Sequence, residues 1–298
     1  MKTALYCGAL ALAGAYFTAA SAAEIEDFDH TGGGTFRSYP VNGLPLLDSF
    51  YFRFADGDER NIQSIQIELA SPIPNPCFEC GPVPAGQMFV SFQDDTEDDP
   101  YFFQISHAEL PVPILRHRTA GYCKATCKTL LDAHNRGDVF VIVGFGFTYV
   151  GERDHHIQRV GLWEQDGVLE VHYRDENDDN LFRFDLEYVW LPAQFMARRG
   201  NASGVEAKGS AGVKIDLGPV AVGPTVLRGF DFVFLPELDI GLTYDQEIRE
   251  IGVRTPGDRI EVYLDNGEQD RFDWGVDWGA LALVPTTQPD PPRVPVKN

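Results

Sequence analysis

The sequence predicts an all-β protein built from three diverged repeats of an antiparallel, β-sandwich-like unit. Apolar and polar residues alternate over many short stretches, and this period of two is typical of strands with one buried face. Several of these stretches recur along the 298-residue chain. A helical period is nearly missing, and the best candidate for a helix is the short segment Lys124–Asn135.

The N-terminus has the pattern of a secretory signal peptide. Lys2 precedes an apolar stretch that ends in Ala20-Ser21-Ala22, the small-residue motif of a cleavage site. We therefore expect residues 1–22 to be removed and the mature protein to be secreted or periplasmic. No second apolar span follows, so we expect no transmembrane segment.

Internal similarity defines the repeat. Residues 90–111 align without a gap on residues 171–192, an offset of 81 (171 − 90), and residues 262–282 repeat the acidic turn and the aromatic strand of both. A second shared stretch lies upstream in each copy, at residues 59–67, 154–162 and 245–253. An aromatic alternation precedes each of these, beginning at Phe50, Phe145 and Phe230. Each unit is therefore expected to contain at least four strands.

The strands of the repeat have one apolar and one polar face. Residues 182–190 alternate between apolar side chains and the charged Arg183, Asp185 and Glu187. Side chains of a strand point alternately to opposite faces, so we expect one face in the core and the other in solvent. The same pattern places Trp190, Trp274 and Trp278 in the core, and His107 takes an equivalent position. For Trp163 the pattern does not decide between the core and the outer face.

Two architectures fit a repeat of this length. One is three sandwich modules in tandem, over residues 23–111, 112–192 and 193–285, followed by a Pro-rich, disordered tail at 286–298. The other is a single β domain with threefold pseudosymmetry. It is favoured by the lack of an obvious flexible linker where the copies join.

Four cysteines follow the signal peptide, as Cys77-x-x-Cys80 and Cys123-x-x-x-Cys127. In an oxidising compartment an even count predicts two disulfides, and the sequence leaves all three pairings open. The paired short spacings also fit a zinc site with four thiolate ligands.

The chain is strongly acidic. Its formal net charge of −21 becomes −22 when the signal peptide takes Lys2 away and no acid with it. This balance argues against nucleic acid and anionic membranes as partners, because both require clustered Lys and Arg. It fits bound cations, a basic protein partner or plain solubility.

The acidic turns of the three copies are candidate calcium sites. Oxygen-bearing side chains at alternate positions let one loop wrap a hard cation. The candidate ligands are Asp94, Thr96 and Asp98 in the first copy, Asp175, Asn177 and Asp179 in the second, and Asp265 and Asp270 in the third. The spacing is not that of an EF-hand, and solvated Asx-turns between paired strands explain the same residues without a metal.

Three functions fit these features. The first is a non-enzymatic binding or adhesion protein with an extracellular ligand, carbohydrate or a basic protein, and calcium in its acidic turns. Repetition favours it, because copies of a binding unit gain avidity. The second is a secreted glycoside hydrolase with paired carboxylates, although no sequence context singles out a pair. The third is a structural component of an envelope or extracellular matrix.

Overall fold

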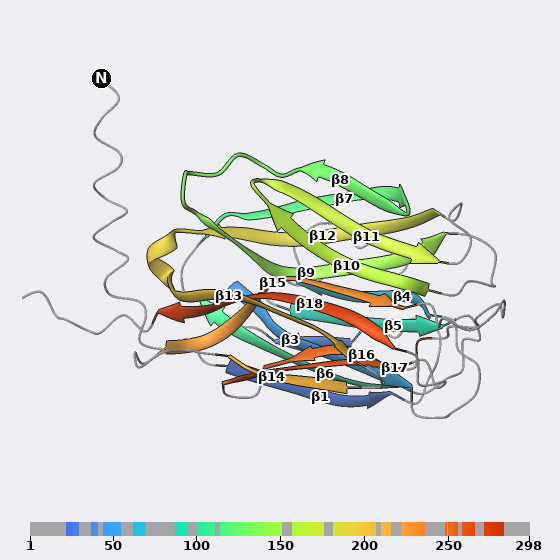
Figure 1. Cartoon of the computed structure of the whole chain (residues 1–298). Helices are drawn as coiled ribbons and strands as arrows, with labels where there is room; N and C mark the ends of the chain where they lie inside the picture. Colours follow the sequence, from blue (N-terminus) through green and yellow to red (C-terminus); the bar gives the residue numbers. More distant parts are fainter. Residues whose placement is uncertain are drawn as a thin grey trace, which may run out of the picture.

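The structure is a computed structural model, and it consists almost wholly of antiparallel strands (Figure 1). It describes residues 22–29, 37–40, 44–54, 62–69, 87–94, 101–110, 114–150, 157–175, 181–206, 210–215, 222–235, 248, 250–255, 258–265 and 271–282. The prediction of an all-β, antiparallel, sandwich-like fold is confirmed. The expected signal peptide lies outside this part of the chain except for Ala22, and the expected tail lies wholly outside it.

In the described part of the chain, each third contains six strands. The first third contains β1 (Ala22–Asp29), β2 (Arg37–Pro40), β3 (Leu44–Phe54), β4 (Ile62–Leu69), β5 (Gln87–Asp94) and β6 (Tyr101–Leu110). The second contains β7 (Arg116–Lys124), β8 (Thr126–Leu130), β9 (Val139–Val150), β10 (Ile157–Gln165), β11 (Val168–Asp175) and β12 (Leu181–Leu191). The third contains a 3-10 turn (Ala193–Phe195), β13 (Met196–Glu206), β14 (Ser210–Lys214), β15 (Val222–Phe234), β16 (Glu250–Arg254), β17 (Arg259–Asp265) and β18 (Phe272–Ala282).

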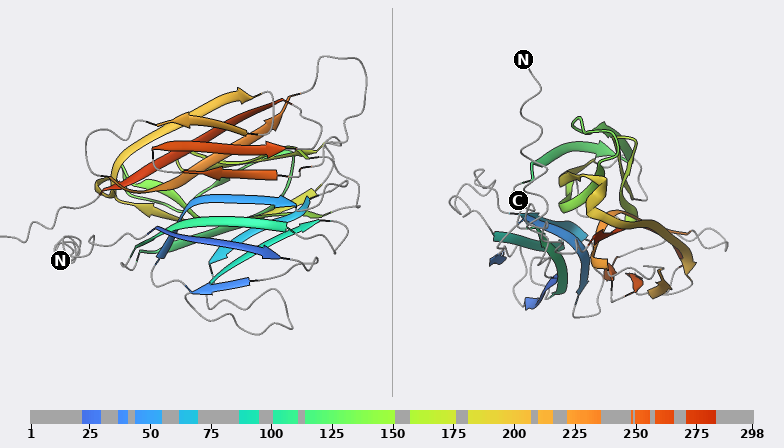
Figure 2. Two further views of the ribbon diagram at one scale, coloured as in Figure 1. Left: turned by 90° about the horizontal axis from the view of Figure 1, so that it is seen from below. Right: turned by 90° about the vertical axis from the view of Figure 1, so that its left-hand side faces the viewer.

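Every sheet is shared between two thirds of the chain. Sheet A has the order β1-β6-β3-β16-β17-β14, sheet B the order β7-β12-β9-β4-β5-β2, and sheet C the order β13-β18-β15-β10-β11-β8. In each sheet, three strands of one third pair through a central junction with three strands of another third, and the three junctions close a ring. The sharing of every sheet joins the described strands into one body. Seen end-on, the blue, green-yellow and orange-red thirds surround a common interior (Figure 2). The boundaries at residues 111 and 192 stay a prediction.

The three junctions have the same register. Leu162 of β10 lies opposite Phe230 of β15, Val253 of β16 opposite Phe50 of β3, and Ile67 of β4 opposite Phe145 of β9. Each of β3, β9 and β15 also has a bulge two residues before its junction phenylalanine, at Asp48, Val143 and Arg228. A bulge adds one residue to one strand and bends it locally. All three central strands therefore carry the same irregularity at the same place.

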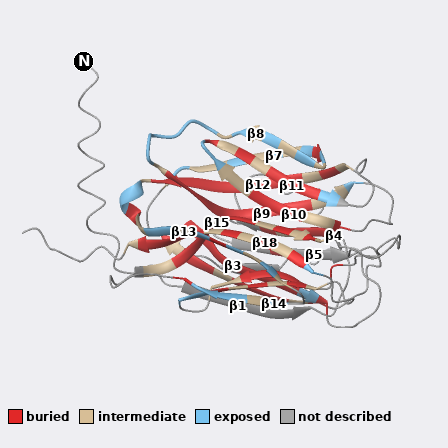
Figure 3. Ribbon diagram, viewed as in Figure 1, coloured by how far each residue is buried: buried red, intermediate tan, exposed pale blue. Residues whose placement is uncertain are grey.

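The core forms where β3, β9 and β15 meet. The rings of Phe50, Phe145 and Phe230 contact one another, with centroids 4.9 to 5.0 Å apart. Around them lies one continuous cluster of buried apolar residues that includes members of all three sheets. Figure 3 shows this burial on β3, β9 and β12 and the exposure of the edge strand β8. One shared core explains why no third of the chain forms a separate sandwich.

The predicted alternation of buried and exposed side chains along the strands holds, except at two charged residues. Trp190, Trp274, Trp278 and His107 are buried as expected. Asp185 and Glu187, expected in solvent, are also largely buried. The neighbouring strand β7 covers them, since Arg118 donates to both carboxylate oxygens of Asp185.

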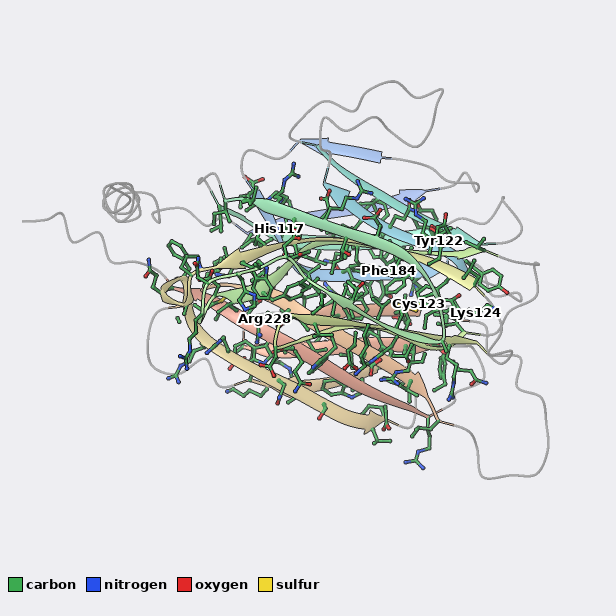
Figure 4. All side chains as sticks on the ribbon, turned by 90° about the horizontal axis from the view of Figure 1, so that it is seen from above. His117, Tyr122, Cys123, Lys124, Phe184 and Arg228 are labelled. Atoms are coloured by element: carbon green, nitrogen blue, oxygen red, sulfur yellow. A yellow bond between two sulfur atoms is a disulfide. The ribbon has the colours of Figure 1, made fainter. Side chains whose placement is uncertain are left out.

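The segment Lys124–Asn135, the best candidate for a helix, does not form one. The chain leaves β7 at Lys124, passes Ala125 in a left-handed conformation (φ 57°), and enters the short strand β8. A disulfide between Cys123 and Cys127 closes this corner, and Tyr173 donates its backbone N–H to the carbonyl of Ala125 (3.2 Å). Pairing of β8 with β11 supplies the backbone hydrogen bonds that a helix would otherwise have made. Cys123 lies beside Tyr122 and Lys124 at one end of β7 (Figure 4).

Candidate functional site

An open cleft of ≈ 700 Å³ lies on the outer face of sheet C. Side chains of β10, β11, β13, β15 and β18 line it. They come from the second and third parts of the chain, so the cleft spans the junction between β10 and β15. Clefts with a few convergent polar groups and an apolar wall are the usual form of small-ligand sites.

Three charged or titratable side chains meet on the floor of the cleft. Asp231 of β15 accepts hydrogen bonds from Nε (3.0 Å) and Nη2 of Arg159, on β10. His172 of β11 lies beside them, with its Nδ1 2.7 Å from Nη2 of Arg159 and 3.1 Å from Oδ1 of Asp231. The paired geometry fixes the carboxylate and the guanidinium in one plane, since two parallel bonds define an orientation.

Gly161 makes this meeting possible. It lies on β10 directly opposite both His172 on one side and Asp231 on the other. A Cβ at this position would lie 2.5 Å from Oδ1 of Asp231 and 2.7 Å from the carbonyl oxygen of Phe230. Because glycine leaves that space empty, the flanking side chains can reach across β10 to each other.

The polar network continues to the edge of the sheet. Glu170, two residues before His172 on β11, lies with Oε2 3.4 Å from Nε2 of the histidine and accepts a hydrogen bond from Lys128 of β8. The hydrogen bond from Lys128 lowers the pKa of Glu170. Burial raises the pKa of Asp231, but the hydrogen bonds from His172 and Arg159 outweigh burial and lower that pKa overall. Both carboxylates are therefore held in the ionised form.

Trp163 supplies the apolar wall. Its indole lies over two glycines of neighbouring strands: a Cβ at Gly229 would lie 3.4 Å from Cε3 of the ring, and one at Gly275 3.8 Å from Cζ3. The side chain is only partly buried and lines the cleft. Glycine backbone thus supports one side of the ring while the residue remains open to a ligand. The ambiguity of Trp163 in the sequence is resolved in favour of the outer face.

The equivalent positions on the other two sheets have different chemistry. In sheet A, Gly252 lies opposite Tyr263 and Tyr51, and the Tyr51 hydroxyl donates to Glu250 (2.6 Å). In sheet B, Gln66 lies opposite Ser91 and Gly146. The same register therefore tolerates three different sets of outer residues. The fold does not require the Arg159–His172–Asp231 cluster, and a function of the sheet C face explains it better.

Most of the residues predicted to bind calcium lie outside the described part of the chain. Asp94, Asp175 and Asp265 are the last residues of β5, β11 and β17, whereas Thr96, Asp98, Asn177, Asp179 and Asp270 are not described. The residues that are described include no group of three or more His, Cys, Asp or Glu side chains placed to hold a metal ion. Calcium at the acidic turns stays a prediction.

The cysteine prediction is tested in part. Cys123 and Cys127 pair with each other, which selects one disulfide and takes these two cysteines out of a four-thiolate zinc site. Cys77 and Cys80 fall outside the described residues.

Sequence reasoning missed the polar floor of the cleft. His172 and Asp231 are 59 residues apart in the chain (231 − 172) and come together only through β10. One local signal existed: Gly161 lies in the middle of a strand, where glycine often marks a close approach of neighbouring groups.

Comparisons with known proteins identify no family for this chain. No protein-family model and no curated protein matches the chain. Among solved structures, the chain is similar to the major capsid protein P2 from Bacteriophage PM2, with 8% identity, a TM-score of 0.20, and coverage of 88% of this chain and 98% of that one. A likeness this weak carries no argument about function.

Within the described ranges, no helix has both the length and the apolar character needed to cross a membrane.

Proposed function

We propose that this chain is a non-enzymatic binding protein whose ligand, a carbohydrate, occupies the cleft on sheet C. The observation that carries the proposal is the Trp163 indole lying next to a rigid set of planar polar side chains, Arg159, His172 and Asp231, in one open cleft. A sugar ring presents apolar C–H groups on its face and hydroxyls around its rim. An aromatic wall suits the face, and fixed carboxylate, imidazole and guanidinium groups suit the rim.

The charge states of two cleft carboxylates, Glu170 and Asp231, favour binding over glycoside hydrolysis. A hydrolase of the usual kind needs one carboxylic acid with a raised pKa, to protonate the leaving group, beside a second carboxylate. In this cleft the pKa values of Glu170 and Asp231 are both lowered, and each carboxylate already accepts hydrogen bonds from a cation. Neither group is suited to act as the acid.

The test is binding of the mature, oxidised protein to a glycan array, followed by titration calorimetry with the best oligosaccharide. We expect Trp163→Ala to weaken binding at least about fivefold, since stacking on an aromatic residue is worth on the order of 1 kcal/mol or more. Tyr122→Ala is the matched control, because this aromatic residue is 65% exposed on β7 of sheet B and does not line the cleft. An array without specific signal, or equal loss in both variants, would contradict the proposal.

We further propose that the protein is exported and that calcium stiffens its acidic turns. The disulfide between Cys123 and Cys127 supports an oxidising compartment. A ligand bound only by the folded state raises the melting temperature. We expect added calcium to raise it and a chelator to reverse the rise, with the effect reduced in the double variant Asp175→Ala, Asp179→Ala. An unchanged melting temperature would leave the turns as solvated connections between strands.

A further inference from the structure

The cleft on sheet C has an excess of negative charge. Its lining includes three carboxylates, those of Glu170, Asp231 and Asp273, against the single guanidinium of Arg159. That guanidinium is already committed to Asp231 through two nitrogens, and Lys128 is bonded to Glu170 at the margin. An anionic ligand would therefore meet carboxylates without an uncommitted cation among the described lining residues.

Asp273 differs from the other two carboxylates. Its Oδ1 is buried and has no hydrogen-bond partner among the described residues. A buried acceptor without a donor is unfavourable, and an ionised acceptor forms the strongest bonds with a charged donor. The side chain lines the cleft, so a donor could come from a bound ligand.

The position of Asp273 relative to Trp163 fixes where that donor would lie. Asp273 and Gly275 are two residues apart on β18 and share the outer face, which places them about 7 Å apart along the strand. Gly275 lies under the ring of Trp163. A sugar stacked on the indole would therefore hold a ring substituent close to the Asp273 carboxylate.

Building on the proposed function, we propose that the carbohydrate carries a free ammonium group, as oligomers of glucosamine do. Trp163 stacks on the sugar ring and also attracts the neighbouring cation through its π-face. The Asp273 carboxylate accepts a hydrogen bond from the ammonium on the side where this residue lines the cleft. Arg159, His172 and Asp231 bind hydroxyls and set the orientation of the sugar.

The test compares two ligands that differ in this one group. Titration calorimetry near pH 6, where an aliphatic amine is protonated, is carried out with a glucosamine tetramer and with its N-acetylated counterpart. We expect the glucosamine tetramer to bind at least about tenfold more tightly. Asp273→Asn keeps the shape of the side chain and should remove this preference, so that the two tetramers bind with similar affinity.

Asp258→Asn is the control for general attraction to an acidic protein. This half-exposed residue lies between β16 and β17 of sheet A and pairs with Lys214. Its substitution removes the same charge at a position that does not line the cleft. Both variants are first checked for an unchanged unfolding midpoint. We expect Asp258→Asn to keep the full preference for the glucosamine tetramer.

The outcomes separate this inference from the proposed function. Equal affinity for both tetramers, or an Asp273→Asn variant that loses affinity for both alike, overturns ammonium recognition but leaves carbohydrate binding in place. An equal loss of preference in the Asp258→Asn control also overturns it. If neither tetramer nor any other glycan binds, both proposals fail.

Discussion

The rings of Phe50 and Phe145 meet edge to face, with centroids 4.9 Å apart and planes at 70°, although 95 residues separate them in the chain (145 − 50). Each lies at the junction of its strand with a strand from another third of the chain. Phe230 completes the group at the third junction. Each ring therefore supports two sheets at once, and the three thirds are expected to unfold together.

Removing one ring of this group should destabilise the whole protein. Phe145→Ala leaves a cavity among fully buried neighbours, which typically costs about 3–5 kcal/mol. The measurement is the free energy of unfolding in urea, followed by far-UV dichroism and by tryptophan fluorescence. Tyr122→Ala, at an exposed position, should change it by only about 0.5 kcal/mol. Two separate transitions in the wild type would contradict a single shared core.

A side chain at residue 161 should weaken binding at the cleft. The Cβ of Gly161→Ala would lie 2.5 Å from Oδ1 of Asp231, so the bonds from Arg159 and His172 to that carboxylate must break or shift. Gly275→Ala is the matched control, because its Cβ would make only an ordinary contact, 3.8 Å from the Trp163 ring. We expect the first variant to lose at least about tenfold in glycan affinity and the second to lose little. Similar losses in both would argue against the role of the cluster.

Stability should depend on the ionisation of Asp277. Burial raises the pKa of Asp277. Arg228, which donates a hydrogen bond to Asp277 (2.9 Å), lowers this pKa by a smaller amount, so that it lies at about 6. An acid whose pKa is raised on folding stabilises the protein below its unfolded pKa of 3.8 and loses this contribution as the pH rises through about 6. The difference between a pKa of 3.8 and one of about 6 corresponds to about 3 kcal/mol.

Asp277→Asn isolates this effect, because the amide does not titrate. Relative to wild type, the variant should become more stable by up to about 3 kcal/mol as the pH rises from about 4 to about 7. Urea unfolding of both proteins across this range measures the difference. Parallel stability curves would show that the carboxyl does not carry a raised pKa.

The disulfide at the corner between β7 and β8 should stabilise the protein modestly. The two cysteines are four residues apart, and closing so short a loop removes little entropy from the unfolded chain, about 2 kcal/mol. We expect the double variant Cys123→Ser, Cys127→Ser to lose about that amount in urea unfolding. Faster hydrogen exchange at the amide of Tyr173, which bonds to Ala125, should accompany the loss. A variant as stable as wild type would show that strand pairing alone holds this corner.

The strands were predictable because their signal is local. Alternation along residues 182–190 and 272–278 identifies the buried face, and the aromatic residues of both stretches are indeed buried. The failure at Lys124–Asn135 has the opposite cause: a few apolar residues in a short polar segment fit a helix equally well. Pairing with β11 and closure of the disulfide decide that segment as a strand.

The sequence by itself determined that this protein is all-β, that its pattern recurs three times, and which side of most strands faces the core, because side-chain alternation is a property of neighbouring residues. Only the tertiary structure decided which strands pair. An alternating strand specifies a buried face but not its partner, so the sharing of every sheet between two thirds of the chain could not be read from it. The cleft has the same origin, because Arg159, His172 and Asp231 meet only where β10 joins β11 on one side and β15 on the other.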